Sequence, residues 1–381
     1  MFARAAMRGC VLIVSAVLAA PAAAADPLAG KPLNFAGVDL SYVNEVEACG
    51  AQFRLNGRVR DPYELFAESG ANLVRLRLWN APDWTTYSTE ADVTHSIERA
   101  KRAGMNVLLD FHYSDDWADP QKQTIPAAWA ADIDNADVLA KHVYEYTRDV
   151  LARLNARGLL PYMVQVGNEI NTQMLRRADS TGIPIDWTRN AKILNAGIRA
   201  VREAVAADGS HPRVMLHVAQ PENVEPWFTA AAAAGVTDFD YIGVSYYPKW
   251  SKLDMTQAER ALAQVKSRFK ADIIIVEVSY PWTLRDAGDS ASNLLGADSL
   301  LRGYPATKTG QQRFMNDVVQ MTLRAGGVGV VYWEPAWVSS RCKTRWGTGS
   351  HWENATLFDF TKRNELTPAA SYLKKIRGLQ P

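Results

Sequence analysis

The sequence predicts an α/β fold: a (β/α)8 TIM barrel that forms a single domain with extended loops after its strands. Strand-like and helix-like segments alternate along the chain, which indicates parallel strands joined by helical crossovers. Eight such units close into a barrel. The eight strand-like runs of β-branched or apolar residues are Asn34–Leu40, Leu73–Leu78, Asn106–Phe111, Tyr162–Val166, Val214–Val218, Tyr241–Val244, Ile273–Val276 and Val328–Tyr332.

Helix-like segments lie between these runs, and glycines stand where several of them should stop, at Gly70, Gly104 and Gly326. An open, doubly wound sheet is the alternative arrangement. It would bring a glycine-rich phosphate turn, and neither G-x-G-x-x-G nor G-x-x-x-x-G-K-[ST] occurs in the sequence. The predicted helices are Pro62–Ser69, Thr94–Ala103, Ala136–Ala156, Thr188–Ala207, Thr256–Phe269 and Gly310–Ala325.

The N-terminus has the pattern of a secretory signal. Arg4 and Arg8 precede an apolar run, and Ala23 and Ala25 frame an A-x-A cleavage site before Asp26. We therefore predict a signal peptide over residues 1–25, a catalytic barrel domain over residues 26–381, and a secreted or periplasmic protein. The apolar run is too short to span a bilayer.

Composition limits the partners. The 42 Lys and Arg residues nearly balance the 41 Asp and Glu residues, which argues against nucleic acid and anionic membranes. No linker divides the chain, so we expect one domain and a monomer. All 12 tryptophans lie at or after Trp79, mostly just beyond strand-like runs, which predicts an aromatic binding face.

Two glutamates follow apolar strands, at the positions where barrel enzymes carry their chemistry. Glu169 comes after the fourth strand, behind Asn168, and Glu277 comes after the seventh. A carboxylate is costly to bury without a partner, so each is a catalytic candidate. The two strands face each other across a barrel, and retaining hydrolysis of a glycosidic bond needs such a pair.

Other strand ends carry candidate supporting groups. Arg77 and Tyr246 are expected to keep Glu277 ionised, although Tyr246 has a packing role as its alternative. Arg75 has period two with Arg77 and either points inward or forms a structural ion pair outside the barrel. Trp333 is expected to lie under the sugar. No paired histidine spacing supports a zinc site.

At these residues the chain resembles glycoside hydrolase family 53, the endo-β-1,4-galactanases. The match covers nearly the whole mature chain, and its most specific motif is the tract from Asp110 to Pro120. The Asn168-Glu169 pair alone would indicate only the larger clan, which includes mannanases, xylanases and cellulases. Further similar motifs are Gly37–Ser41, Gly70–Asn80, Gln165–Glu169, Ser245–Pro248, Glu277–Trp282 and Tyr332–Trp337.

The resemblance implies retaining endo-hydrolysis of galactan or type I arabinogalactan, with Glu169 as acid/base and Glu277 as nucleophile. The resemblance also implies that this hydrolysis requires no cofactor. Another β-glycanase of the clan is one alternative, and a non-catalytic sugar-binding protein of the cell envelope is a second, although the two intact glutamates argue against it. The supporting residues it implies are Asp39, Arg77, Asp110, His112, Trp117, Asn168, Tyr246, Trp282 and Trp333.

Two departures from the family pattern affect metal binding. Val278 follows the nucleophile where a small residue is usual, and the loop Leu284–Asn293 differs from the acidic run with which some bacterial members bind calcium. Asp286, Asp289 and Asn293 are weak candidates for calcium ligands, together with groups near Asp359. Solvated loop residues are the alternative.

Cys49 follows the first strand and Cys342 the eighth, and barrel closure makes these strands neighbours. An extracellular disulfide between the two loops is therefore expected. Two free thiols are the alternative.

Overall fold

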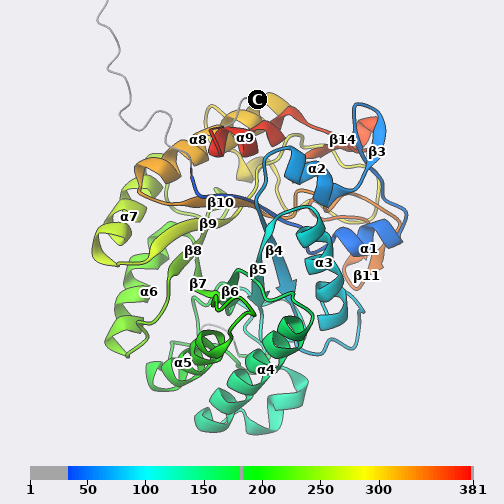
Figure 1. Ribbon diagram of the computed structural model, residues 1–381. Helices are drawn as coiled ribbons and strands as arrows, with labels where there is room; N and C mark the ends of the chain where they lie inside the picture. Colours follow the sequence, from blue (N-terminus) through cyan, green and yellow to red (C-terminus); the bar gives the residue numbers. More distant parts are fainter. Residues whose placement is uncertain (1–32, 181–182, 379–381) are drawn as a thin grey trace, which may run out of the picture. The chain divides into compact units, whose positions relative to one another are not determined.

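The computed structural model describes residues 33–180 and 183–378. The predicted signal peptide, residues 1–25, therefore lies outside the described residues. Eight parallel strands form a closed barrel in the order β1-β10-β9-β8-β7-β6-β5-β4 (Figure 1). All eight predicted strands and the barrel are confirmed. The barrel strands are β1 (Phe35–Asp39), β4 (Leu73–Leu78), β5 (Asn106–Phe111), β6 (Met163–Val166), β7 (Arg213–Ala219), β8 (Tyr241–Ser245), β9 (Asp272–Val278) and β10 (Gly329–Tyr332).

Helices surround the barrel, and the six predicted ones are confirmed with ends shifted by a few residues. The three predicted stops, Gly70, Gly104 and Gly326, all have positive φ, which glycine adopts without strain. The α-helices are α1 (Val43–Ala48), α2 (Pro62–Glu68), α3 (Glu90–Arg102), α4 (Ala136–Ala156), α5 (Trp187–Glu203), α6 (Pro221–Ala233), α7 (Met255–Arg268), α8 (Lys308–Arg324) and α9 (Tyr372–Ile376).

Short elements in the loops were not predicted, because two- or three-residue strands carry no periodic signal. Strands β2 (Phe53–Leu55) and β3 (Arg58–Arg60) join β13 (Phe358–Asp359) and β14 (Glu365–Leu366) in one sheet, and β11 (Lys343–Thr344) pairs with β12 (Gly347–Thr348). The 3-10 helices are η1 (Ala127–Asp132), η2 (Ala297–Ser299), η3 (Glu353–Ala355), η4 (Phe360–Lys362) and η5 (Pro368–Ser371). Long loops follow β5, β6, β9 and β10, as expected.

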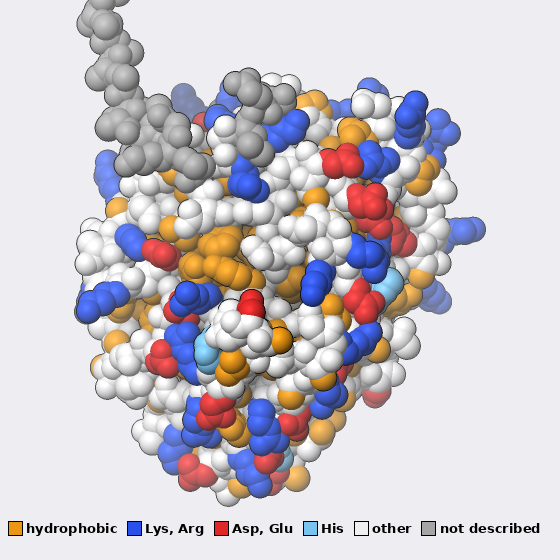
Figure 2. Space-filling model, in the orientation of Figure 1, with side chains coloured by type: hydrophobic (Ala, Val, Ile, Leu, Met, Phe, Trp, Pro, Cys, Tyr) orange, Lys and Arg blue, Asp and Glu red, His pale blue; other side chains and the backbone are white. Residues whose placement is uncertain are grey.

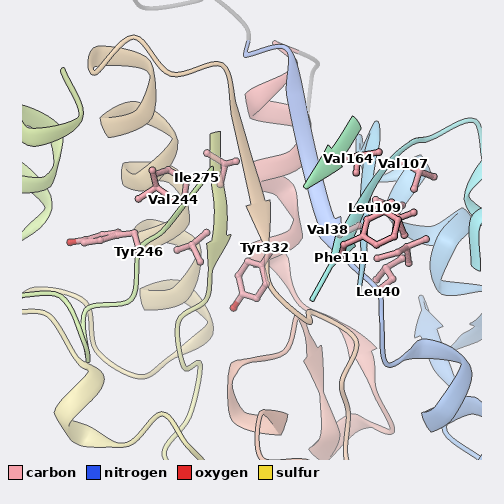
Figure 3. Close-up of a cluster of buried hydrophobic side chains, with 14 of the residues drawn as sticks. Val38, Leu40, Val107, Leu109, Phe111, Val164, Val244, Tyr246, Ile275 and Tyr332 are labelled. Atoms are coloured by element: carbon pink, nitrogen blue, oxygen red, sulfur yellow. The ribbon is translucent and has the colours of Figure 1, made fainter. Parts of the chain in front are cut away.

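The strands divide their side chains between two layers. One side packs against the helices, and Figure 3 shows part of this layer, including Val38, Leu109 and Tyr246. The other side forms a separate apolar cluster with members from all eight strands, so this cluster lies inside the barrel. It comprises Phe35, Leu73, Leu108, Met163, Met215, Tyr241, Ile274, Val276 and Val331.

Two residues further along four of the eight strands, the inward positions become polar. Arg75 follows Leu73, Asp110 follows Leu108, Gln165 follows Met163 and His217 follows Met215, and all four side chains are buried. The apolar layer thus closes the barrel below a buried polar layer at the C-terminal ends of the strands.

The surface carries mixed charge. On the face drawn in Figure 2, basic and acidic side chains are interspersed around a hydrophobic patch, without a large field of one sign. Within residues 33–180 and 183–378, every helix is too short or too polar to cross a membrane.

A disulfide joins Cys49, at the end of α1, to Cys342, in the loop after β10, with their Cα atoms 5.2 Å apart. The predicted pairing is confirmed. The bond closes a loop with a sequence separation of 293 residues.

Because so long a loop is closed, we expect reduction of this bond to lower the free energy of unfolding by about 5 to 6 kcal/mol on the loop-entropy model. Urea unfolding with and without reductant measures the effect. The Cys49→Ala/Cys342→Ala double variant is the control and should not respond to reductant. Two titratable thiols in the native, unreduced protein would refute the bond.

Candidate active site

Arg75, on β4, lies at the centre of the buried polar layer with only 1% of its surface exposed. Its guanidinium has five N–H groups. Nη1 donates to Asp39 at 2.9 Å and to Glu277 at 2.7 Å. Nη2 donates to Asp110 at 2.8 Å and to Asn168 at 2.6 Å, and Nε donates to Gln165 at 3.2 Å. Every donor of Arg75 therefore has an acceptor, and the ends of four strands, β1, β5, β6 and β9, are tied to one side chain of β4.

Glu277 receives a second hydrogen bond from the Tyr247 hydroxyl, at 3.0 Å. A β-bulge in β9 aims its side chain inward. Val244 on β8 pairs with Ile275, but the next residue, Ser245, pairs with Glu277, so β9 holds one extra residue there. A bulge of this kind reverses the alternation of side chains. Glu277 thus points into the barrel like Ile274 and Val276, while Val278 packs outside.

Glu169 stands at the end of β6 in a backbone conformation with φ of 44°, which is uncommon for a residue with a side chain. Gly167, at φ 85°, lies just before it; a Cβ atom there would come within 2.6 Å of Ile170. The Ser245 hydroxyl donates to Glu169 Oε1 at 2.6 Å. Strained backbone of this kind is typical of functional sites.

A carboxylate oxygen of Glu169 and one of Glu277 lie within 4.8 Å of each other, and of a nitrogen of His217. Carboxyl groups about 5 to 5.5 Å apart are typical of retaining glycosidases, whereas inverting enzymes need about 6.5 to 9.5 Å to admit a water. The spacing therefore fits nucleophilic attack by one carboxylate.

The two carboxyl groups titrate differently. Burial and the nearby charge of Glu277 raise the pKa of Glu169 well above its ordinary value. Burial also raises the pKa of Glu277, to about 7, but Arg75 and the Tyr247 hydroxyl oppose this rise. Glu277 is thus the group that ionises first, and Glu169 is the group that keeps its proton.

The tract after β5 contacts this polar layer through His112 and Ala118. His112 contacts Asp110 Oδ2 through Nε2 at 3.0 Å, and its Nδ1 accepts from the Ala118 amide at 3.0 Å. This amide contact fixes His112 as the Nε2–H tautomer, so it donates to Asp110. Asn168 donates to the Ala118 carbonyl at 2.7 Å, which links the loop to Glu169.

Aromatic rings form a second group around Arg77. Its guanidinium lies 4.1 Å from the ring centre of Trp117 and 4.6 Å from those of Tyr42 and Trp79. Trp117 in turn packs against Trp333, with centroids 5.9 Å apart. Trp117 and Trp333 are half-buried, so parts of both rings remain accessible.

The expected partners of Glu277 were wrong, by two residues on β4 and by one residue after β8. Arg77 pairs with Glu334 instead, and Arg75 takes the place beside Glu277. Tyr246 points outward into the helix-facing layer (Figure 3), its hydroxyl 3.5 Å from the Leu253 carbonyl, while Tyr247 contacts Glu277. Arg75 and Arg77 both face inward, but Arg75 is one layer deeper.

Alternation along β8 would have identified Tyr247, because Tyr241, Gly243, Ser245 and Tyr247 share one face. His217 was missed, although a histidine within an apolar strand is an unusual core residue. Ser245 and Gln165 begin two of the motifs similar to the family, but no role was predicted for either side chain.

Trp282 is buried against other groups. Its ring lies 4.9 Å from that of Phe360 and 5.6 Å from the Lys308 ammonium. Its role in binding sugar therefore stays a prediction.

Two of the three calcium candidates come together. Oxygens of Asp286, Asp289 and Glu353 lie within 4.8 Å of one another. Asp359 itself lies outside this cluster and pairs with Lys308, whereas Glu353, from the same segment of the chain, joins the cluster. Calcium binding here stays a prediction. Asn293 donates to the Arg285 carbonyl at 3.4 Å, and its Oδ1 atom is buried without a hydrogen-bond partner among the described residues.

Replacing Arg75 with lysine should destabilise the fold and inactivate the site, because an ammonium has three donors and cannot serve five acceptors. Breaking a buried ion pair costs about 3 to 5 kcal/mol. Chemical denaturation measures the loss. Arg202→Lys is the control: Arg202 also pairs with two aspartates but is partly exposed, so we expect under about 1 kcal/mol. Equal losses in the two variants would contradict the central role of Arg75.

Comparisons with known proteins agree with this geometry. The model of glycosyl hydrolase family 53 matches residues 35–373. The chain is 48% identical over 370 residues to an arabinogalactan endo-β-1,4-galactanase of Cellvibrio japonicus, covering 97% of each protein. It is 34% identical to an endo-β-1,4-galactanase of Bacillus subtilis, covering 85% of this chain and 77% of that protein.

Solved structures give the same result. The Ignisphaera aggregans GH53 catalytic domain superimposes with a TM-score of 0.81 at 30% identity, covering 92% of this chain and 98% of that domain. A fungal β-1,4-galactanase gives a TM-score of 0.76 at 29% identity, covering 90% of this chain and 99% of the other. The chain is therefore a glycoside hydrolase and belongs to glycosyl hydrolase family 53.

Proposed function

We propose that this protein hydrolyses β-1,4-galactosidic bonds within galactan and type I arabinogalactan, with retention of configuration. The observation that carries the mechanism is the pair Glu169 and Glu277, with carboxylate oxygens within 4.8 Å. The substrate follows from the galactanases of Cellvibrio japonicus and Bacillus subtilis, which are similar over most of the chain.

In the first step, ionised Glu277 attacks the anomeric carbon while Glu169 protonates the departing glycosidic oxygen. Arg75 and Tyr247 hold the Glu277 carboxylate in place through its two oxygens. In the second step, Glu169 removes a proton from water, which hydrolyses the glycosyl-enzyme ester. This chemistry uses two carboxyl groups and needs no cofactor.

The rings of Trp117 and Trp333 supply the surface on which a galactose unit stacks. Each ring is half-buried, and the two rings pack against each other, so little side-chain freedom is lost when the sugar binds. A polysaccharide is thus the proposed partner, and a monomer is sufficient because every group of the site comes from one chain.

We also propose that the protein is exported. Residues 1–25 have the pattern of a cleaved signal peptide. The Cys49–Cys342 disulfide supports export, since such bonds persist in oxidising compartments such as the periplasm and the medium.

A structural calcium ion is a further part of the proposal. Asp286, Asp289 and Glu353 offer hard oxygen ligands, and Glu353 Oε2 is buried without a hydrogen-bond partner among the described residues. Burial, with the charges of Asp289 and Asp286, raises the pKa of Glu353 to about 8. A cation at this cluster would offset that cost and tie the loop after β9 to η3.

The proposed activity predicts reducing-sugar release from linear β-1,4-galactan. Glu277→Ala and Glu169→Ala should each lower kcat by at least about 100-fold, because each removes a reacting group. Circular dichroism checks that both variants fold. Activity on mannan, xylan or glucan instead would overturn the substrate while keeping the mechanism. Silence on all of these polymers would favour a non-catalytic sugar-binding protein.

The acidic limb of the pH–activity profile should report Glu277, which must be ionised. Tyr247→Phe removes a hydrogen bond that lowers the pKa of Glu277. The pKa should therefore rise, and the limb should move to higher pH by about one unit. Tyr246→Phe is the matched control and should leave the limb in place. A shift of the limb in Tyr246→Phe, with none in Tyr247→Phe, would instead identify Tyr246 as the partner of Glu277.

Calcium should raise the melting temperature, and EDTA should reverse the effect. Calcium needs deprotonated ligands, so the rise should be larger at pH 8 than at pH 6. Glu353→Gln should remove most of the response, because the amide keeps one oxygen but no charge. An unchanged melting temperature across the calcium titration would eliminate the site.

A further inference from the structure

A chain of buried polar side chains contacts Glu169 through Ser245 and continues to His217. Ser245 Oγ lies 2.6 Å from Glu169 Oε1 and 2.8 Å from His217 Nε2. His217 Nδ1 lies 2.9 Å from Asn168 Oδ1. Ser245 and His217 are fully buried, so these contacts are their hydrogen-bonding environment.

A hydroxyl has one hydrogen, so Ser245 cannot donate to both neighbours at once. When Glu169 is ionised, Ser245 donates to Oε1, and the Ser245 oxygen then accepts from His217 only if Nε2 carries a hydrogen. When Glu169 carries a proton on Oε1, it donates to Ser245, which is then free to donate to a bare Nε2. The protonation of Glu169 therefore selects a tautomer of His217.

The surroundings of His217 Nδ1 provide partners for either tautomer. A hydrogen on Nδ1 finds Asn168 Oδ1 at 2.9 Å. A bare Nδ1 finds the Gln165 amide nitrogen at 3.2 Å and the backbone N–H of Glu169 at 3.4 Å.

Asn168 cannot rotate to change this arrangement. Its oxygen accepts from Arg75 and its amide nitrogen donates to the Ala118 carbonyl.

His217 responds without gaining charge. Burial, with the positive charge of Arg75, holds its pKa well below the ordinary value, so the ring stays neutral in either state. Charged or titratable groups from the neighbouring strands and loops face this chain. They are Arg75 on β4, Asp110 on β5, His112 and Asp119 in the loop after β5, Tyr247 after β8, and Glu277 on β9. Arg75, Asp110, His112 and Tyr247 are paired by contacts given above, and the Asp119 side chain accepts the amides of Gln121 and Lys122. Glu277 is paired with Arg75 and Tyr247 but titrates, with a pKa of about 7, so the variants below must separate its effect from that of Glu169.

We propose that Ser245 and His217 form a reversible hydrogen-bond relay in which the tautomer of neutral His217 follows the protonation state of Glu169. The proposal rests on the assignment of Glu169 as acid/base. Both residues are positioning residues, because they act on the substrate only through Glu169. The relay keeps Oε1 hydrogen-bonded both in the resting enzyme, where Glu169 is protonated, and after the first step, where Glu169 is ionised.

The experiment is nitrogen NMR of the protein labelled with ¹⁵N-histidine, recorded across a pH titration, with the His217 signals assigned by their loss in His217→Gln. In the wild type we expect Nδ1–H at low pH and Nε2–H at high pH. The midpoint should coincide with the alkaline limb of activity. A single tautomer throughout, or an imidazolium at low pH within the active range, would overturn the relay.

Two variants identify the cause of the change. Ser245→Ala should abolish the dependence of the tautomer on pH, since the link to Glu169 is lost. Glu169→Gln should abolish it because the amide does not titrate. A tautomer change that persists in either variant would show that another group, such as Asp110 or Glu277, drives it, and would refute the proposal.

The NMR reading needs no substrate. A protein inactive on galactan whose His217 tautomer still follows pH would therefore refute the proposed function and leave the coupling intact. An active protein with a fixed tautomer would do the opposite.

Discussion

The buried guanidinium of Arg75 is the interaction on which the site depends. Several carboxylates converge at the C-terminal mouth of the barrel, where each would be costly to bury alone. Arg75 donates to three of them, Asp39, Asp110 and Glu277, and its remaining donors reach Asn168 and Gln165. One positive charge therefore favours the ionised form of Glu277, the proposed nucleophile, and fixes Asn168, which precedes Glu169, the proposed acid/base.

The site divides into a charged half and a neutral half with different tasks. Arg75 and Tyr247 contact Glu277 and favour its ionised form. Glu169 accepts a hydrogen bond from the neutral Ser245 and forms no ion pair with an arginine in the part of the chain that the structure describes. Two chemically identical carboxyl groups thus differ in protonation because their neighbours differ. The aromatic group around Arg77 lies outside this division and is the proposed surface for the sugar.

The sequence predicted the barrel well because eight apolar runs alternate with helical segments. It also placed Glu169 and Glu277 correctly at strand ends. It failed where a single residue decides the direction of a side chain. The bulge in β9 that turns Glu277 inward leaves no mark in residue type, and the choice between Tyr246 and Tyr247 depends on register. The calcium cluster was incomplete because Glu353 comes from a distant segment.

The central proposal is that Glu277 attacks the sugar directly. The carboxyl groups of Glu169 and Glu277 lie too close together to leave room for an attacking water beside the substrate. The anomeric form of the first product tests this proposal. Proton NMR of galactan during the first minutes of hydrolysis, before mutarotation, should show β-anomeric reducing ends. Initial formation of the α anomer would mean inversion and would contradict the proposed mechanism.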